Sequence, residues 1–400
     1  MDQHTLTILS IAATTRINTN IEGAPGAGKT ETLMALGKAL GFSPESEDHF
    51  FWMPNPSSAD PSDFSGPLAK GMYGGREVSH YMPPRDVVKL QLSKPGKPNK
   101  YAQDMGINWP TTGCAAFISE GTTLHPRVQA PLLAMLDARA AIGTHPIQPY
   151  TWVVFDSNPP DIATNGQELS MPMLSRMMHI KWPVSVKLWA DLMMKGFPEP
   201  KIPVVPDEWL AHLPVSRALV ASFANKNPES IYSESFFKQL KDSDRGKPYP
   251  TLRPWTWFTR ANAAWMAMGA DEEVRFDMLA GLVGNAGATA FAEYIENEDL
   301  PDTREWLEDP STFKLSKRGD IATISLTSMV AHVCQSKNPK WWTSAWTILN
   351  LCMKGNRGDL AIMVCPPLIP LFRENDKMFP ITKKDLELFV PMLKASGMIS

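Results

Sequence analysis

Short apolar runs and amphipathic stretches alternate along the first half of the chain. We interpret the apolar runs as strands, because helical or loop segments separate each run from the next. This alternation is typical of a parallel sheet that carries helices on both faces. The sequence therefore predicts an α/β fold with a parallel five-stranded sheet, whose strands lie at 17–21, 50–53, 114–119, 152–155 and 177–182.

From about Pro183 onward the strand signals fade, and apolar residues recur at helical spacing. Pro366 and Pro367 interrupt one of these helical stretches. We therefore expect the second half of the chain to be mostly α-helical. The predicted helices cover 188–194, 207–213, 216–224, 235–240, 255–268, 274–294, 325–335, 340–351, 359–372 and 383–396.

The stretch at 66–110 is rich in Pro, Gly and Lys and shows little periodicity. We interpret it as an insertion in the sheet domain, and loops of this length are more often functional than accidental. Lys94, Lys97 and Lys100 lie within it. These lysines are compatible with an acidic partner, but a solvated loop is the simpler interpretation.

The residues after the first predicted strand fit G-x-x-x-x-G-K-S/T, the pattern of the phosphate-binding loop. Its glycines let consecutive N–H groups turn inward toward an anion, and the N-terminus of the next helix favours negative charge. That helix is indicated at 32–40 by Leu33, Leu36 and Leu40 on one face. A chance glycine-rich turn is the alternative, but the flanking strand and helix favour nucleotide binding. The candidate binding residues are Gly23, Ala24, Pro25, Gly26, Ala27, Gly28, Lys29, Thr30 and Glu31.

Two side chains of this loop have specific chemistry. Lys29 offers a positive charge to the β- and γ-phosphates, and Thr30 offers a hydroxyl to Mg²⁺, so ATP and Mg²⁺ are the predicted cofactors. The predicted strand at 114–119 ends at Ser119 and is followed by Glu120. An acid on the strand next to the phosphate loop can orient or deprotonate an attacking water. An ordinary acid at the surface is the alternative for Glu120.

Composition narrows the class of protein. The chain has 400 residues, of which 43% are hydrophobic and 20% charged, as in a globular protein of two or three domains. The net charge of −3, without a basic block, argues against nucleic acid as the main partner. The four cysteines and eight histidines lack metal-ligand spacing, and the cysteines are too sparse for a disulfide scaffold. We expect no signal peptide, no membrane span and a cytoplasmic location.

Around Glu120 the chain resembles the MoxR family of AAA+ ATPases. The resemblance implies that Lys29 and Thr30 are the Walker A lysine and metal-binding hydroxyl, and that Glu120 is the Walker B catalytic base. It covers blocks in the family's order that together span about two thirds of the chain, at 23–30, 61–66, 117–139, 155–176 and 250–255.

The resemblance also assigns three residues further along the chain. It implies that Asn158 is a sensor-1 residue that positions water and that Arg176 is an arginine finger for a neighbouring subunit. It implies that Arg253 is a sensor-2 residue on a helical lid. Each has a simpler alternative: Asn158 caps a turn, Arg176 forms a surface ion pair, and Arg253 stacks on Trp255 or Trp257.

The chain departs from the family pattern at Ser119, where the family has an Asp that holds the Mg²⁺ shell. A serine hydroxyl can bond a metal-bound water but adds no negative charge. Ser119 therefore joins Thr30 as a candidate metal ligand, and the departure puts hydrolysis in question. Pro131 lies inside the helix predicted at 126–139 and is expected to kink it.

The resemblance implies an AAA+ nucleotide-binding domain at 1–183, an α-helical lid at 184–300 and an α-helical C-terminal extension at 301–400. It implies a hexameric ring that hydrolyses ATP at subunit interfaces to remodel a protein partner, in a chaperone-like way. Members of the family often act with a von Willebrand factor A domain protein. Two alternatives stay open: a nucleotide-gated scaffold that hydrolyses ATP poorly, and a DNA-linked motor, which the acidic net charge disfavours.

Overall fold

The computed structural model describes residues 2–46, 49–54, 60–93, 99, 102–103, 109–110, 113–121, 124, 126–137, 140–159, 169–234, 247–297, 301–382, 387, 389 and 391. The chain divides into two compact units. The first comprises Met1–Asn99, Trp109–Val205 and Glu229–Ala290, and the second comprises Lys100–Asn108, Pro206–Pro228 and Phe291–Ser400. The division into a nucleotide-binding domain, a lid and an extension stays a prediction.

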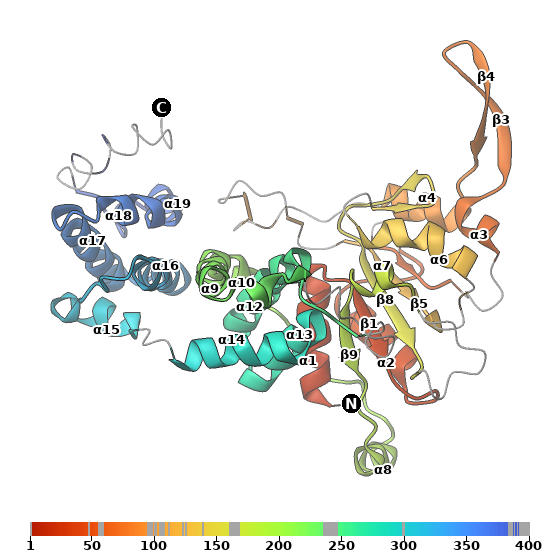
Figure 1. Ribbon diagram of the computed structural model, residues 1–400, viewed down its shortest axis with the longest axis horizontal. Helices are drawn as coiled ribbons and strands as arrows, with labels where there is room; N and C mark the ends of the chain where they lie inside the picture. Colours follow the sequence, from red (N-terminus) through yellow and green to blue (C-terminus); the bar gives the residue numbers. More distant parts are fainter. Residues whose placement is uncertain are drawn as a thin grey trace. The chain divides into compact units, whose positions relative to one another are not determined.

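A parallel five-stranded sheet forms the centre of the first unit (Figure 1). Its order is β2-β5-β8-β1-β9, and every neighbouring pair is parallel. Each strand lies in or overlaps an apolar run identified in the sequence, so the predicted α/β fold is confirmed. The strands are β1 (Thr19–Glu22), β2 (Phe51–Trp52), β5 (Ala115–Ile118), β8 (Trp152–Ser157) and β9 (Met178–Lys181).

The order of the strands corrects one expectation. The strand that precedes Glu120 was expected to lie next to the strand of the phosphate loop, but β8 lies between β5 and β1. Ile118 of β5 pairs with Phe155 of β8, and Ile21 of β1 pairs with Asp156 of β8. Parallel strands need crossover connections, and a crossover can skip a position that a later strand fills. Position along the chain therefore did not give position in the sheet.

Short helices cover one face of this sheet. They are α3 (Pro61–Ser65), α4 (Arg85–Leu92), α6 (Pro126–Leu133), the 3-10 helix η3 (Ala134–Leu136) and α7 (Met171–Leu174). Because side chains alternate along a strand, Ala116, Ile118, Val153 and Phe155 share this buried face. The helix predicted at 126–139 is shorter than expected: with Pro131 inside it, α6 ends at Leu133 and continues as η3.

The predicted irregular insertion contains an antiparallel hairpin. Strands β3 (Leu68–Tyr73) and β4 (Arg76–Tyr81) pair over their whole length and extend away from the sheet (Figure 1). Gly74 and Gly75 form the two-residue turn at φ 58° and 77°, in the left-handed region that such hairpin turns require. The stretch interpreted as a loop insertion thus carries two strands, and α4 follows them. A second, small hairpin is formed by β6 (Ala141–Ile142) and β7 (His145–Pro146).

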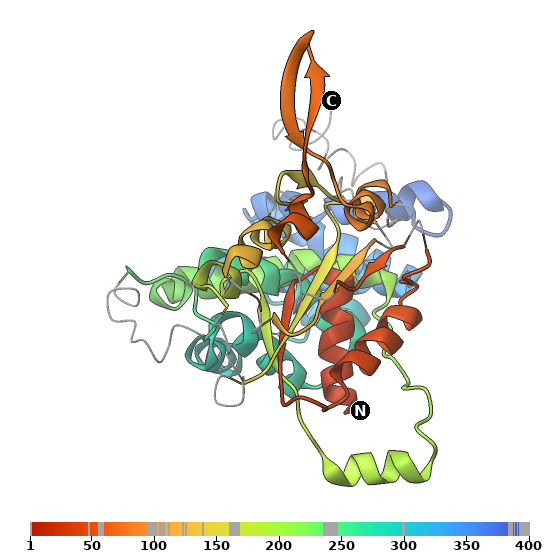
Figure 2. The same cartoon turned by 90° about the vertical axis from the view of Figure 1, so that its right-hand side faces the viewer.

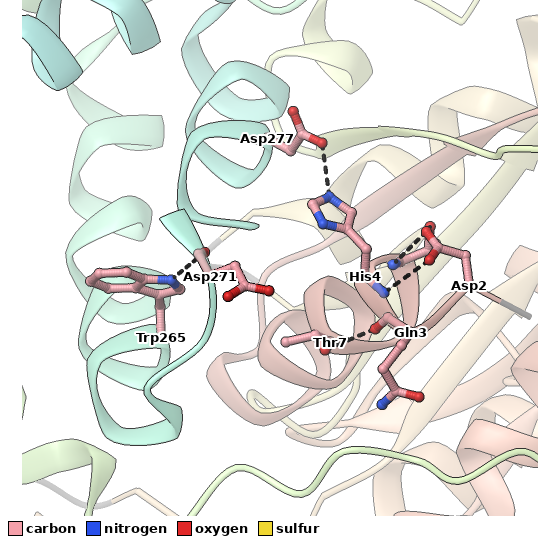
Figure 3. A network of polar contacts seen from close by, with 8 residues as sticks. Asp2, Gln3, His4, Thr7, Trp265, Asp271 and Asp277 are labelled. Atoms are coloured by element: carbon pink, nitrogen blue, oxygen red, sulfur yellow. Dashed lines mark hydrogen bonds and ion pairs between the residues drawn. The ribbon is translucent and has the colours of Figure 1, made fainter. Parts of the chain in front are cut away.

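Three long helices also belong to the first unit: α1 (Gln3–Thr15), α12 (Leu252–Met268) and α13 (Glu272–Val283). Asp2 caps α1 by accepting hydrogen bonds from the backbone of His4 and Thr5. His4 Nε2 also lies 2.9 Å from Asp277 Oδ2 on α13 (Figure 3). The sequence did not predict α1, because nearly all of its residues are buried and no polar stripe marks its period.

The chain leaves the sheet after β9 through a segment that carries α8 (Val186–Met194). None of the residues in α8 is buried, and Figure 2 shows the helix held away from the sheet by two extended stretches. Met194 is 88% exposed and Trp189 52% exposed. The predicted helix at 188–194 is confirmed, and its apolar side chains have solvent contact.

Helices make up the described part of the second unit, around a core that includes Trp306, Trp342 and Trp346. Several predicted helices are confirmed, with two changes. The helix predicted at 274–294 is broken at Gly284, at φ 84°, and the one at 207–213 is a 3-10 helix. The prediction at 235–240 lies outside the described residues, as does most of 383–396.

The remaining helices, some of which belong to the first unit, are α2 (Lys29–Ala39), η4 (Asp207–His212), α9 (Leu213–Lys226), α10 (Pro228–Ile231), α14 (Asn285–Asn297), α15 (Thr303–Glu308), η6 (Pro310–Thr312), α16 (Gly319–Ser336), α17 (Pro339–Lys354), α18 (Gly358–Val364), η7 (Pro366–Leu368) and α19 (Ile369–Glu374).

Two further expectations concern membranes and cysteines. Among the described helices, none is both long and apolar enough to cross a membrane. All four cysteines are buried free thiols.

Candidate functional site

The loop between β1 and α2 has the conformation that its glycines predict. Gly26 and Gly28 have φ values of 72° and 77°, in the left-handed region that side chains rarely adopt. A Cβ atom placed on either residue would meet no heavy atom within 4 Å. The requirement for glycine here is therefore conformational, and the loop faces open space.

The start of α2 presents unpaired backbone donors to that space. Within the described residues, the N–H groups of Lys29, Thr30 and Glu31 donate no hydrogen bond to a backbone oxygen, whereas Thr32 N–H donates to Gly28 O at 3.3 Å. Such N-terminal N–H groups, together with the helix dipole, favour an anion at this end of a helix. This arrangement suits a phosphate group.

Trp182, just after β9, supports the loop from the side. Its backbone N–H donates to Glu22 O at 2.7 Å, and its indole Nε1 donates to Ala27 O at 3.0 Å. A Cβ atom on Gly23 would lie only 2.6 Å from the Trp182 Cβ, so Gly23 is required for this close packing. Sequence reasoning did not identify Trp182, because its contact with the loop depends on the pairing of β9 with β1.

The ammonium group of Lys29 lies inside this loop. The residue is 6% exposed, and Nζ donates to Gly23 O at 2.6 Å and to Ala24 O at 3.1 Å. Nζ also lies 3.8 Å from Asp156 Oδ2. Burial lowers the pKa of Lys29, while the negative charges of Asp156 and Glu120 act against that shift. Lys29 is thus a buried cation whose hydrogen bonds are to the loop itself.

Asp156 is the carboxylate that faces Lys29. It lies in β8, is 7% exposed, and accepts a hydrogen bond from the backbone N–H of Glu120. Burial raises the pKa of Asp156, and the hydrogen bond from Glu120 N–H and the charge of Lys29 oppose that rise. Sequence reasoning did not include Asp156 among the candidates. The available signal was an acid at the end of the apolar run at 152–155.

Glu120 and Ser119 follow β5 at the same edge of the sheet. Glu120 has a φ of 54°, which is unusual for a residue with a side chain, and its backbone is fixed in this conformation by Asp156. Its side chain is exposed, while Ser119 is half-buried. The structure therefore brings together Lys29, Ser119, Glu120 and Asp156 around the phosphate loop.

The other predicted residues have different surroundings. Asn158 is half-buried and lies two residues after Asp156, beyond the end of β8. Arg176 is also half-buried, and its Nη1 donates to Pro172 O in its own turn at 2.6 Å. Arg253 is exposed in the first turn of α12, and among the described residues no hydrogen bond or ion pair joins it to the phosphate loop. The roles suggested for these three residues stay predictions.

The oxygen atoms at this site fit a cation that is coordinated partly by the protein and partly by phosphate. In the described part of the chain, no cluster of three or more His, Cys, Asp or Glu residues is placed to hold a metal alone. Mg²⁺ is commonly held by one or two carboxylates together with phosphate oxygens and water. The protein groups present are the hydroxyl of Thr30 in α2, the hydroxyl of Ser119 and the carboxylate of Asp156. This oxygen-only set suits Mg²⁺.

The chain was compared with known proteins. No family model matches it, and no curated protein matches it. Among solved structures it is similar to one described as a "putative ATPase" from Cytophaga hutchinsonii, at 18% sequence identity and a TM-score of 0.42. That similarity covers 73% of this chain and 87% of the other. The function proposed below follows from the residues of the site.

Proposed function

We propose that this protein is a MoxR-like AAA+ ATPase that binds Mg²⁺ and ATP at the Gly23–Thr30 loop and hydrolyses the bond between the β- and γ-phosphates of ATP. The observation that carries this proposal is the loop itself, which combines unpaired N–H groups at the start of α2 with the buried Lys29 ammonium, bonded to carbonyl groups of the loop. A loop of this kind binds phosphate groups through its backbone and its lysine. Glu120, at the same edge of the sheet, supplies an acid beside it.

Hydrolysis requires few changes in the surrounding side chains. Lys29 exchanges its bonds to Gly23 and Ala24 for bonds to phosphate oxygens, which carry more negative charge than carbonyl oxygens. Glu120 accepts a proton from the attacking water, while Asn158 helps to position that water. Bound Mg²⁺ neutralises charge on the phosphates. Arg176 and Arg253 add positive charge during the transfer, with Arg176 acting on the site of a neighbouring subunit.

The proposal extends to a hexameric ring that acts on a protein partner, such as a von Willebrand factor A domain protein. The β3–β4 hairpin suits contact with such a partner, because it presents large apolar side chains to solvent. Tyr73 is 81% exposed, Met72 70% and Leu68 64%. Exposed apolar groups gathered on one element often mark a protein-binding surface. ATP-dependent movement of a lid would then change the position of the hairpin.

Steady-state ATP hydrolysis, measured over a range of protein concentrations with Mg²⁺ present, tests this proposal. We expect specific activity to rise with concentration, because the arginine of one subunit completes the site of the next. Arg176→Ala should remove that rise, and mixing Arg176→Ala with Glu120→Gln should restore activity, since one mixed interface is intact. Specific activity that is independent of concentration, with no rescue on mixing, would contradict the ring.

Ser119 favours a second candidate, a nucleotide-gated scaffold that binds ATP but hydrolyses it poorly. In that case the metal lacks a carboxylate at position 119, and Ser119→Asp should raise hydrolysis strongly. No increase would count against the scaffold. Asp156, which lies beside Ser119 in the register of β5 and β8, bears directly on this choice.

A further inference from the structure

Two strand ends meet at the phosphate loop, and only one of them carries a buried carboxylate. The residue after β5 that faces this edge is Ser119, a neutral group. On the adjacent strand, Asp156 lies one position beyond the pair Ile118–Phe155 and is therefore beside Ser119. On the other side of β8, Asp156 pairs with Ile21 of β1, just before the loop begins. The carboxylate of this edge thus comes from the strand that lies next to the loop.

Two contacts hold the carboxylate of Asp156 in place. One oxygen, Oδ1, accepts a hydrogen bond from the backbone N–H of Glu120. The other oxygen, Oδ2, faces Lys29 Nζ at 3.8 Å, longer than the bonds from Nζ to Gly23 and Ala24. A carboxylate has about four lone-pair sites, so Oδ2 retains the capacity to accept another strong donor or a cation.

We propose that Asp156 supplies the carboxylate for the Mg²⁺ that accompanies ATP, in place of the neutral Ser119 at the adjacent register position. This inference rests on the proposed function, because it assigns a role at the same ATP site. The metal site then has a carboxylate, but this group comes from β8 and not from the end of β5, where Ser119 lies. A neutral serine beside Asp156 is compatible with this role, whereas a second carboxylate at that position would repel the first.

The competing interpretation is that Asp156 only neutralises Lys29 and fixes the turn at Glu120. The two interpretations differ in what magnesium does. A structural counter-ion affects ATP binding equally with and without Mg²⁺, because it acts through the position of Lys29. A metal carboxylate affects only the part of the affinity that Mg²⁺ provides. Without Mg²⁺, its negative charge near the phosphates is unfavourable.

The experiment measures ATP affinity for each variant twice, once in Mg²⁺ and once in excess EDTA, by titration with a fluorescent ATP analogue. In Asp156→Asn we expect the ratio of the two affinities to fall about tenfold or more, the loss typical of one charged hydrogen bond. Affinity in EDTA should be equal to that of the unmodified protein or tighter. The matched control is Asp191→Asn on the exposed helix α8, which should leave both affinities unchanged.

A carboxylate exchange sharpens the test. Ser119→Asp alone should not increase the Mg²⁺ effect, whereas Ser119→Asp combined with Asp156→Ser should restore the effect that Asp156→Asn loses. Electron paramagnetic resonance of Mn²⁺ with ATP gives a second readout, in which Asp156→Asn should weaken binding of the ion. If Asp156→Asn does not fold, the exchanged variant decides alone, because it keeps one carboxylate at this edge.

The outcomes separate this inference from the proposed function. Mg²⁺-dependent ATP binding that survives Asp156→Asn would overturn the inference and leave ATP binding intact. Equal losses in Mg²⁺ and EDTA would overturn it in favour of a structural counter-ion. An exchanged variant that folds without recovering the Mg²⁺ effect would also overturn it. If the unmodified protein binds no ATP under either condition, both the proposed function and this inference are wrong.

Discussion

The loop edge of the sheet (Gly23–Thr30, Ser119, Glu120 and Asp156) and the β3–β4 hairpin belong to the same unit but are stabilised in opposite ways. At the loop edge, Lys29 and Asp156 are less than a tenth exposed, and each has hydrogen bonds from or to its neighbours. In the hairpin, every residue of β4 is exposed, and the backbone ladder is its main internal contact.

This difference indicates that the two regions have different functions. Phosphate transfer depends on charges that are already in position, so the chain uses buried side chains and backbone groups to hold them. A surface that contacts a partner does not need such support before binding, and it can expose apolar groups at little cost to the fold. If this is correct, substitutions at the loop edge should alter nucleotide chemistry, and substitutions in the hairpin should leave it unchanged.

The largest effect is expected from Glu120→Gln, which removes the proposed base without changing the size of the side chain. Hydrolysis should fall about 10²–10⁴-fold, the range typical of general-base catalysis, while ATP affinity stays close to that of the unmodified protein. Single-turnover hydrolysis with excess protein measures this directly. Glu45→Gln, in an exposed loop, is the control and should be fully active. Normal hydrolysis in Glu120→Gln would show that another group takes the proton.

Lys29→Ala should weaken ATP binding about 100-fold, because it removes a buried positive charge from the phosphate loop and leaves Asp156 uncompensated. Isothermal titration with ATP and Mg²⁺ gives the affinity. Lys38→Ala on the same helix provides the comparison, since Lys38 is 78% exposed and forms an ion pair with Glu199 at the surface. Equal affinities for the two variants would place the phosphates elsewhere.

The loop edge was only partly predictable from sequence, because some of its contacts join residues that are far apart along the chain. The loop from Gly23 to Thr30 is one local segment, so its conformation follows from its own glycines and flanking elements. The same holds for the five strands, whose apolar residues mark them individually. Asp156 and Trp182 became site residues only through the pairing of β1 with β8 and β9, and no local pattern contains that order.

The hairpin was missed although its contacts are local, because its own residues show no periodic pattern. A strand exposed on both faces needs no alternation of apolar and polar residues, so the segment showed no period. The Gly74–Gly75 pair was a usable signal, because two glycines between short segments favour a hairpin turn. Helix α1 shows the reverse case, since burial on all sides also removes periodicity.

A smaller effect is expected from Trp182→Phe, which keeps an aromatic ring but removes the indole N–H that donates to Ala27 O. The free energy of unfolding should fall by about 1 kcal/mol, the usual contribution of one hydrogen bond. KM for ATP should rise more than kcat falls, because the loop is loosened but Glu120 is untouched. Chemical denaturation and steady-state kinetics measure these changes. Trp189→Phe on α8, where Trp189 is 52% exposed, is the matched control and should change neither.

The smallest effect is expected in the hairpin. Met72→Ser combined with Tyr73→Ser should change the free energy of unfolding by less than about 0.5 kcal/mol and leave basal ATP hydrolysis intact, because both side chains are mostly exposed. Phe64→Ala in α3, just before the hairpin, should instead cost about 3–5 kcal/mol, since Phe64 is 1% exposed in the core. Denaturant unfolding of the two variants gives the contrast. A large loss of stability or of hydrolysis in the Met72/Tyr73 variant would mean that the hairpin supports the fold or the site, and the two regions would then not be independent.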